Sequence, residues 1–216
     1  MPSDSAPALS QSLATNLWRQ NQALAARILA HPFVRGLGDG SLPKASFRRY
    51  VAQDAYFLEA FARAYAVCLA TSHEREDLYD FAGLIGGVIE ELRLHAGYAA
   101  LWKVELEGVV PNPATLAYTN FLATTAARGS IGETAAAMTP CMRLYAFLGQ
   151  SLARGPVADP YAEWIRTYAA PEFETLAARL EAVLDRHARD LPPIHTAYRQ
   201  AMLLELEFFA ACHAGG

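Results

Sequence analysis

Three observations predict an all-α protein built as a helical bundle. Apolar residues recur at helical spacing along nearly the whole chain, and no alternating strand pattern competes with them. Short clusters of turn-forming residues interrupt this pattern often enough to leave segments of roughly 12 to 30 residues, the size of bundle helices joined by short loops. At 216 residues and 53% hydrophobic composition, the chain is long enough to bury a core without disulfides or metals. We therefore expect a single domain over residues 1–216.

Six interruptions define the expected helices in order along the chain. Each is rich in Gly, Pro, Ser or charged residues, which favour turns over helix interiors. They lie at residues 36–43, 71–76, 107–113, 127–132, 154–160 and 189–193. Asn112 before Pro113 and Asp159 before Pro160 both have the pattern of an N-cap followed by proline at the first helical position. Helices are expected to begin at these two points.

Charge and composition limit the class of ligand that the protein is expected to bind and the cell compartment in which it is expected to work. The formal net charge is -4, the pI is near 5.9, and Lys and Arg form no cluster, so neither a nucleic acid nor an anionic membrane is an expected partner. The first 18 residues include Asp4 and lack the basic start and apolar core of a secretory signal. The uncharged run 108–127 contains two prolines and four threonines, which make it a poor membrane helix. Three widely spaced cysteines are typical of free thiols, and we expect a cytoplasmic protein that binds a small molecule.

The second expected helix, residues 44–70, places a carboxylate on its apolar stripe. Asp54 lies between Tyr50 and Phe57 at the spacing of the buried face. Burying an unpaired carboxylate costs about 3 kcal/mol or more, so Asp54 needs a partner. Two interpretations stay open: it binds a neighbouring helix end or an arginine, or it faces a ligand pocket.

The third expected helix places Glu91 and His95 one turn apart on one face. This pair could be half of a carboxylate-bridged metal site, but such sites in bundles need further carboxylates and histidines on facing helices. The other histidines lie near segment ends or without a glutamate at the required spacing. We therefore expect no metal and a structural hydrogen bond between Glu91 and His95.

The segment TPCMRLYAFLG, residues 139–149, places a proline inside a helical pattern. With Thr139 as a cap and Pro140 as the first residue, the helix is expected to restart, which puts Cys141 at a helix N-terminus. The positive end of the helix dipole favours a thiolate, so the pKa of Cys141 is expected to be lowered. Tyr145 lies one turn later on the same face. The competing interpretation is that Cys141 is a packed core residue.

The last expected helix repeats the pattern seen at Asp54. Glu205 lies at the centre of an apolar series that runs from Ile194 to Cys212, whereas Glu207 is expected to face solvent. Burial among aromatic residues raises the pKa of a glutamate, which suits a general acid near neutral pH.

The order of several motifs resembles the TenA/thiaminase II family over nearly the whole chain. In order, the motifs are HPFVRGLGDGSLPKASFRRYVAQDAYFLEAFARAYA, EELRLHAGY, PATLAYTNFL, TPCMRLYAFLG, YAEWIRTYAAPEF and LELEFF. The resemblance implies a helical bundle of the heme-oxygenase-like type, usually a homotetramer, that needs neither metal nor haem.

The resemblance also implies an activity, the hydrolysis of a substituted aminopyrimidine. One such reaction releases ammonia from 4-amino-5-aminomethyl-2-methylpyrimidine in thiamin salvage, and another cleaves thiamin itself; both give hydroxymethylpyrimidine. The implied roles are that Cys141 adds to the ring, Glu205 moves a proton at the ring, and Asp54 binds the ring amino group with the adjacent nitrogen. The other implied substrate-binding residues are Phe57, Tyr118, Tyr145 and Tyr168, with Tyr168 expected to orient Glu205.

Three positions depart from the family pattern, and two other functional classes stay open. Phe57 replaces a tyrosine that many members have. At residues 204–209 the family often has YExxFW and this chain has LExxFF, so Leu204 replaces the tyrosine and Phe209 the tryptophan. These differences bear on substrate preference. A non-catalytic pyrimidine-binding or regulatory protein would keep Asp54 and the aromatic residues without needing a reactive thiol. A metal-dependent oxidase of the same architecture would need more ligands than Glu91 and His95.

Overall fold

The computed structural model describes residues 12–214, and all regular structure in this range is helical. The all-α prediction is therefore confirmed for the described residues. The expectation about a secretory signal depends largely on residues 1–11, which lie outside this range. The helices are α1 (Leu13–Leu29), α2 (Pro32–Asp39), α3 (Lys44–Thr71), α4 (Arg75–Trp102), α5 (Pro113–Arg128), α6 (Ile131–Leu152), α7 (Ala162–Ala169), α8 (Pro171–His187) and α9 (Pro192–Ala214).

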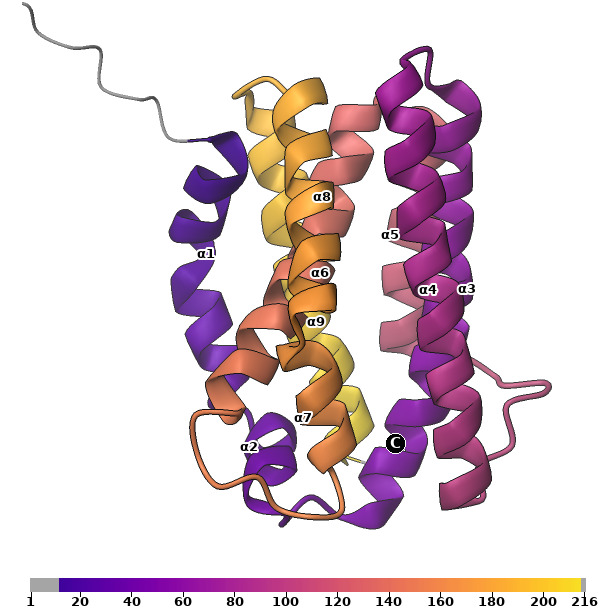
Figure 1. The fold of residues 1–216 in the computed structure, drawn as a ribbon, viewed down its shortest axis with the longest axis vertical. Coiled ribbons are helices and arrows are strands. Elements are labelled where there is room, and N and C mark those ends of the chain that lie inside the picture. The colour runs from indigo at the N-terminus through magenta and orange to yellow at the C-terminus, as the bar shows by residue number, and fades with distance from the viewer. Residues whose placement is uncertain (1–11, 215–216) are drawn as a thin grey trace, which may run out of the picture.

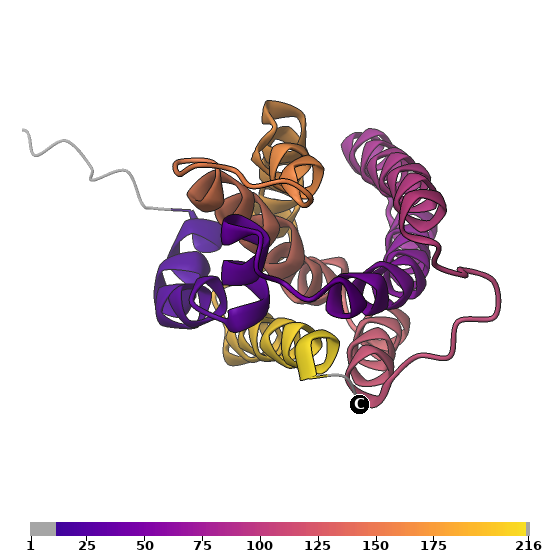
Figure 2. The same cartoon turned by 90° about the horizontal axis from the view of Figure 1, so that it is seen from below.

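The long helices run side by side along the long axis of the bundle, and α6 occupies its interior (Figures 1 and 2). Helix α6 contacts α8, α9, α7, α5, α3 and α1. Its sequence explains this position, because every residue from Thr134 to Met142 is buried and a helix that is apolar on all sides belongs in a core. The pair α3 and α4 forms one side of the bundle, and α1 lies on the opposite side (Figure 1).

Local capping signals account for several helix starts. The Asn112 side chain accepts a hydrogen bond from the Thr115 amide and Pro113 follows at the first position, so this predicted cap is confirmed. Ser130 and Glu133 form a capping box at the start of α6. The predicted cap at Asp159 is wrong: the Asp159–Pro160 peptide is cis and α7 begins only at Ala162.

Helix α6 passes through Pro140 without a restart. Proline removes the amide that would otherwise bond the carbonyl four residues back, but the helix continues on both sides of it to Leu152. Thr139 does not act as a cap, because its hydroxyl donates to the Ala135 carbonyl (2.7 Å) within the same helix. Cys141 therefore lies in the middle of α6, which corrects the expectation that it begins a helix.

Among the described residues, no helix combines the length and the apolar character that crossing a bilayer requires. The uncharged run 108–127 divides into a loop and most of α5.

Candidate active site

The side chains predicted to form a site come from α3, α5, α6, α7 and α9 and meet inside the bundle. Asp54 is 3% exposed, Cys141 is 8% exposed and Glu205 is 1% exposed. Their charges act on one another, since both Asp54 and Glu205 raise the pKa of Cys141. Two carboxylates and a thiol are thus concentrated in a region shielded from water, where electrostatic interactions are strong.

Asp54 is paired with His95 rather than with an arginine or a helix end. His95 Nε2 lies 2.7 Å from Asp54 Oδ2, and both side chains are buried. The contact joins the two groups by charge without the alignment of a hydrogen bond, so Asp54 Oδ2 has no hydrogen-bond donor among the described residues. Burial opposes ionisation of His95, but the contact with Asp54 and its charge outweigh burial and raise the pKa of His95. Asp54 is held in place and keeps the capacity to accept a hydrogen bond from a ligand.

The orientation of His95 is fixed by its own helix. His95 Nδ1 donates to the backbone carbonyl of Glu91 (2.9 Å), one turn earlier in α4. The expected hydrogen bond between Glu91 and His95 is therefore present, but its acceptor is the backbone carbonyl, which leaves the Glu91 carboxylate free to bind elsewhere. Among the described residues, no three His, Cys, Asp or Glu side chains are arranged to hold a metal ion.

Glu205 is the second buried carboxylate, and Tyr118 positions it. The Tyr118 hydroxyl donates to Glu205 Oε1 (2.9 Å). Burial raises the pKa of Glu205 to about 8, with the Asp54 charge adding to the increase and the hydrogen bonds from Tyr118 and Cys141 opposing it. A carboxyl group with this pKa can both take up and release a proton near neutral pH.

Cys141 is a protonated thiol, not the activated thiolate that the sequence predicted. Burial raises the pKa of Cys141 well above its ordinary value, and the nearby carboxylates of Glu205, Glu91 and Asp54 raise it further. The prediction of a lowered pKa is wrong because Cys141 is not at a helix terminus and faces negative charge from three other helices. The thiol therefore needs a base to become a nucleophile, and Glu205 interacts directly with it.

Tyr168 binds a different glutamate from the one expected. Its hydroxyl donates to Glu91 Oε1 (2.5 Å), while Glu205 is bound by Tyr118. The expectation that Tyr168 orients Glu205 is corrected because α5, not α7, supplies the hydroxyl that reaches the α9 carboxylate. Burial raises the pKa of Glu91 to about 7, with the Asp54 charge adding to this increase and His95 and Tyr168 opposing it.

Aromatic rings form the walls around these polar groups. The Tyr145 ring packs against Tyr168 with centroids 4.8 Å apart, and Phe57 packs against Tyr118 at 4.7 Å. Phe57 thus lies in the site region, and its missing hydroxyl leaves this wall apolar. All seven predicted side chains lie in this region.

Sequence reasoning placed Tyr50 on the buried face but missed Trp164 and the bond between these two buried residues. Trp164 Nε1 donates to the Tyr50 hydroxyl (3.0 Å) in the core. Each lies one turn before a predicted site residue, Tyr50 before Asp54 and Trp164 before Tyr168, and this spacing is the signal that would have indicated Trp164.

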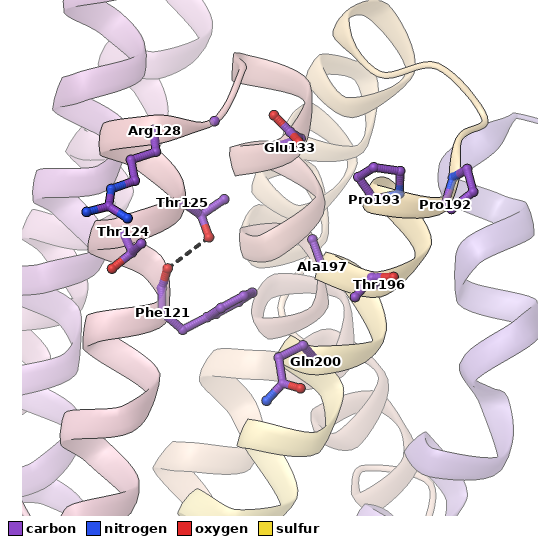
Figure 3. Close-up of a pocket in the computed structure, with 11 residues that line it drawn as sticks. Phe121, Thr124, Thr125, Arg128, Glu133, Pro192, Pro193, Thr196, Ala197 and Gln200 are labelled. Atoms are coloured by element: carbon purple, nitrogen blue, oxygen red, sulfur yellow. Dashed lines mark hydrogen bonds between the residues drawn. The ribbon is translucent and has the colours of Figure 1, made fainter.

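Two surface pockets differ in their relation to the site. One, of about 590 Å³, lies between α5 and the start of α9, with Phe121 pointing toward α9 (Figure 3). It contains none of the predicted site residues. The other, of about 420 Å³, lies between residues 84–94 of α4 and residues 167–176 of α7 and α8, with Met142 of α6 also lining it. We call this second pocket the α4–α8 groove; Glu91 forms part of its wall.

Comparison with known proteins identifies the family. The TENA/THI-4/PQQC family model matches residues 18–211. The chain is 34% identical over 210 residues to an aminopyrimidine aminohydrolase of Halalkalibacterium halodurans, covering 92% of this chain and 94% of that protein. It is also 34% identical over 233 residues to the mitochondrial bifunctional TH2 protein of Arabidopsis thaliana, where the match covers 95% of this chain but only 38% of the larger protein.

A solved structure shows the same fold at comparable length. The TenA homologue protein from P. horikoshii OT3 superposes with a TM-score of 0.87 at 25% identity, covering 95% of this chain and 100% of that one. The family match extends over nearly all the described helices and includes every predicted site residue. The chain belongs to the TENA/THI-4/PQQC family.

Proposed function

We propose that the chain is a hydrolase of thiamin metabolism that cleaves the exocyclic substituent from an aminopyrimidine by covalent catalysis. The observation that carries this proposal is the buried cluster in which Glu205 and Asp54 raise the pKa of Cys141 and Asp54 also raises that of Glu205, with Tyr118 hydrogen-bonded to Glu205. The similarity to an aminopyrimidine aminohydrolase over nearly its full length supports the same activity.

Asp54 is the group suited to bind the pyrimidine. An aminopyrimidine presents an amino group, which donates hydrogen bonds, next to a ring nitrogen, which accepts them. Asp54 Oδ2 lacks a donor among the described residues and can accept from the amino group. His95 holds the carboxylate in position through the 2.7 Å contact. The Phe57, Tyr118 and Tyr145 rings supply flat apolar surfaces for the ring.

Addition of Cys141 to the ring requires one proton to move from sulfur to nitrogen. The Cys141 proton passes to the Glu205 carboxylate while Sγ bonds to a ring carbon, and Glu205 then delivers the proton to the adjacent ring nitrogen. The π bond between the ring carbon and the adjacent ring nitrogen is broken, a C–S bond forms, an N–H bond replaces the S–H bond, and Glu205 returns to its carboxylate form. The pKa of about 8 for Glu205 suits this exchange, because neither transfer is strongly uphill.

Loss of aromaticity then permits the substituent to leave. The substituent leaves from its cationic form, a protonated aminomethyl nitrogen or a thiazolium. Its C–N bond breaks with the electron pair going to nitrogen, an electron pair of the ring forms the double bond to the exocyclic methylene carbon, and neutral ammonia or thiazole departs. Water adds to this carbon, and elimination of the Cys141 thiol restores the aromatic ring and releases hydroxymethylpyrimidine. The same steps release ammonia from an aminomethyl substrate or a thiazole from thiamin.

Product analysis with the wild-type protein tests this function. The purified protein is incubated separately with 4-amino-5-aminomethyl-2-methylpyrimidine and with thiamin, and hydroxymethylpyrimidine and ammonia are quantified. We expect hydroxymethylpyrimidine in both reactions and stoichiometric ammonia from the first. Tight pyrimidine binding without turnover of either substrate would replace the hydrolase with a non-catalytic binding or regulatory protein.

Three further properties are proposed with this function: a single domain over residues 1–216, a homotetramer, and a cytoplasmic location. Light scattering on the purified protein and cell fractionation test the last two.

A further inference from the structure

The α4–α8 groove shares its inner wall with the candidate site. Glu91 and Met142 line the groove, and Met142 directly follows Cys141 in α6. The Glu91 carboxylate accepts the Tyr168 hydrogen bond, and the Phe173 ring, which also lines the groove, packs edge-on against the Tyr168 ring with centroids 4.9 Å apart. A molecule bound in this groove would therefore touch Glu91, whose charge also raises the pKa of Cys141.

All the charged side chains that line the groove are acidic. Three carboxylates line it, those of Glu90, Glu91 and Glu172, and no Lys, Arg or His does. Glu90 is paired with Arg93 on the same helix, whereas neither Glu91 nor Glu172 forms an ion pair within residues 12–214. The rest of the lining is largely apolar, with leucine, valine, methionine and phenylalanine side chains. Such a surface is complementary to a cation with an apolar body and opposes anions.

The groove is large enough to hold a leaving group of the substrate that is bigger than an ammonium group. Its volume of about 420 Å³ falls within the range of roughly 300 to 1,000 Å³ typical of small-molecule sites. The substituents relevant to the proposed reaction are a protonated aminomethyl group and the thiazolium of thiamin, and both carry positive charge on the atom bonded to the exocyclic carbon.

We propose that the α4–α8 groove holds the cationic substituent of the pyrimidine before and during its departure, with Glu91 as the carboxylate that contacts it and Glu172 as a second negative charge. This inference rests on the proposed function and deepens it by assigning a second subsite. Asp54 and Cys141 bind the ring, and the groove selects substrates whose leaving group is cationic.

A charge reversal away from the reacting atoms tests the subsite. Glu172 is exposed in the first turn of α8 and has no role in the proposed chemistry. We expect Glu172→Lys to lower kcat/KM for the aminomethylpyrimidine and for thiamin by about three- to tenfold, mainly through KM, since reversing one charge near a cation in water has effects of this size. The affinity for hydroxymethylpyrimidine, measured by calorimetry, stays unchanged because its substituent is neutral. The matched control is Glu207→Lys on α9, an exposed site that does not line the groove.

A second variant changes the shape of the groove instead of its charge. Leu176 lines the groove and lies close to Gly87, so Leu176→Trp narrows it. We expect thiamin cleavage to fall more than ammonia release, because the thiazolium is the larger substituent. Circular dichroism and thermal melting establish that each variant is folded.

The outcomes separate the subsite from the function itself. The subsite proposal is overturned, and the proposed function is not, if two results occur together. These are an unchanged kcat/KM in Glu172→Lys and an unchanged ratio of thiamin cleavage to ammonia release in Leu176→Trp. An equal loss in Glu207→Lys, or an equal loss of affinity for hydroxymethylpyrimidine, likewise overturns it. Absence of turnover by the wild-type protein overturns the proposed function and the subsite with it.

Discussion

The hydrogen bond from Tyr118 to Glu205 makes a quantitative prediction about pH dependence. In the proposed reaction the free enzyme is active with Glu205 as a carboxylate and Cys141 as a thiol, so kcat/KM rises with pH through the pKa of Glu205, near 8. The Tyr118 hydroxyl stabilises the carboxylate form, because it donates to Oε1 at 2.9 Å. Tyr118→Phe removes this donor while keeping the ring.

The size of the effect follows from the strength of the hydrogen bond. A bond to a charged group contributes about 1.5 to 3 kcal/mol and one pKa unit corresponds to about 1.4 kcal/mol, so Tyr118→Phe raises the pKa of Glu205 by about one to two units. The rising limb of the kcat/KM profile shifts to higher pH by the same number of units. Activity at pH 7 falls by about ten- to a hundredfold, since each unit lowers the fraction of Glu205 in the carboxylate form about tenfold.

The assay is the pH profile of ammonia release by wild type and by Tyr118→Phe between about pH 6 and about pH 11, a range set to bracket the shifted pKa. The matched control is Tyr198→Phe, which removes a buried hydroxyl that has no partner among the described residues and lies outside the predicted site. The reasoning is refuted if the limb in Tyr118→Phe stays in place or moves to lower pH, or if Tyr198→Phe shifts it equally.

Three other predictions concern the thiol, the buried ion pair and helix packing. Because burial and carboxylates raise the pKa of Cys141, its alkylation by iodoacetamide should be slow at pH 7 and accelerate only in strongly alkaline solution; rapid labelling below pH 7, located by peptide mass spectrometry, would contradict this. Asp54→Asn leaves buried His95 without its anionic partner and should lower the free energy of unfolding by about 3 to 5 kcal/mol. The folded pKa of His95 is raised above 6.5, so the pair's contribution is complete below that pH and is lost as pH rises through the raised value. The difference in Tm between wild type and Asp54→Asn should therefore be larger at acidic than at alkaline pH, and the opposite trend would exclude a charged pair. Gly149→Ala places a Cβ 2.4 Å from the Tyr168 carbonyl carbon and should lower Tm, whereas Gly97→Ala meets no atom within 4 Å and should raise it; equal effects would contradict the packing of α6 on α7.

Much of the fold follows from local signals. Helical periodicity and the turn clusters predict the long helices, and the cap at Asn112 lies where its side chain and Pro113 indicate. Asp159 is followed by proline just as Asn112 is, but it is not a cap because α7 begins only at Ala162, beyond Pro160. Local chemistry alone does not separate these two cases.

The site can be predicted only in part from the sequence, because its contacts join residues on different helices and the sequence pattern of one helix does not show which helices pack together. The stripe pattern correctly indicates that Asp54 and Glu205 are buried. It does not identify their partners, since the pairing of Asp54 with His95 depends on how α3 packs on α4. The pKa of Cys141 is misjudged for the same reason: an argument from one helix omits the carboxylates that three other helices bring close to the thiol.

Comparison of ammonia release by wild type, Cys141→Ser and Cys68→Ser tests the central claim most directly. Cys68 is also a buried free thiol, but it lies outside the predicted site, so its replacement controls for general loss of a core sulfur. The account predicts that wild type and Cys68→Ser release ammonia from 4-amino-5-aminomethyl-2-methylpyrimidine and that Cys141→Ser, although folded and able to bind hydroxymethylpyrimidine, does not. Turnover by Cys141→Ser at the wild-type rate would contradict covalent catalysis by this thiol.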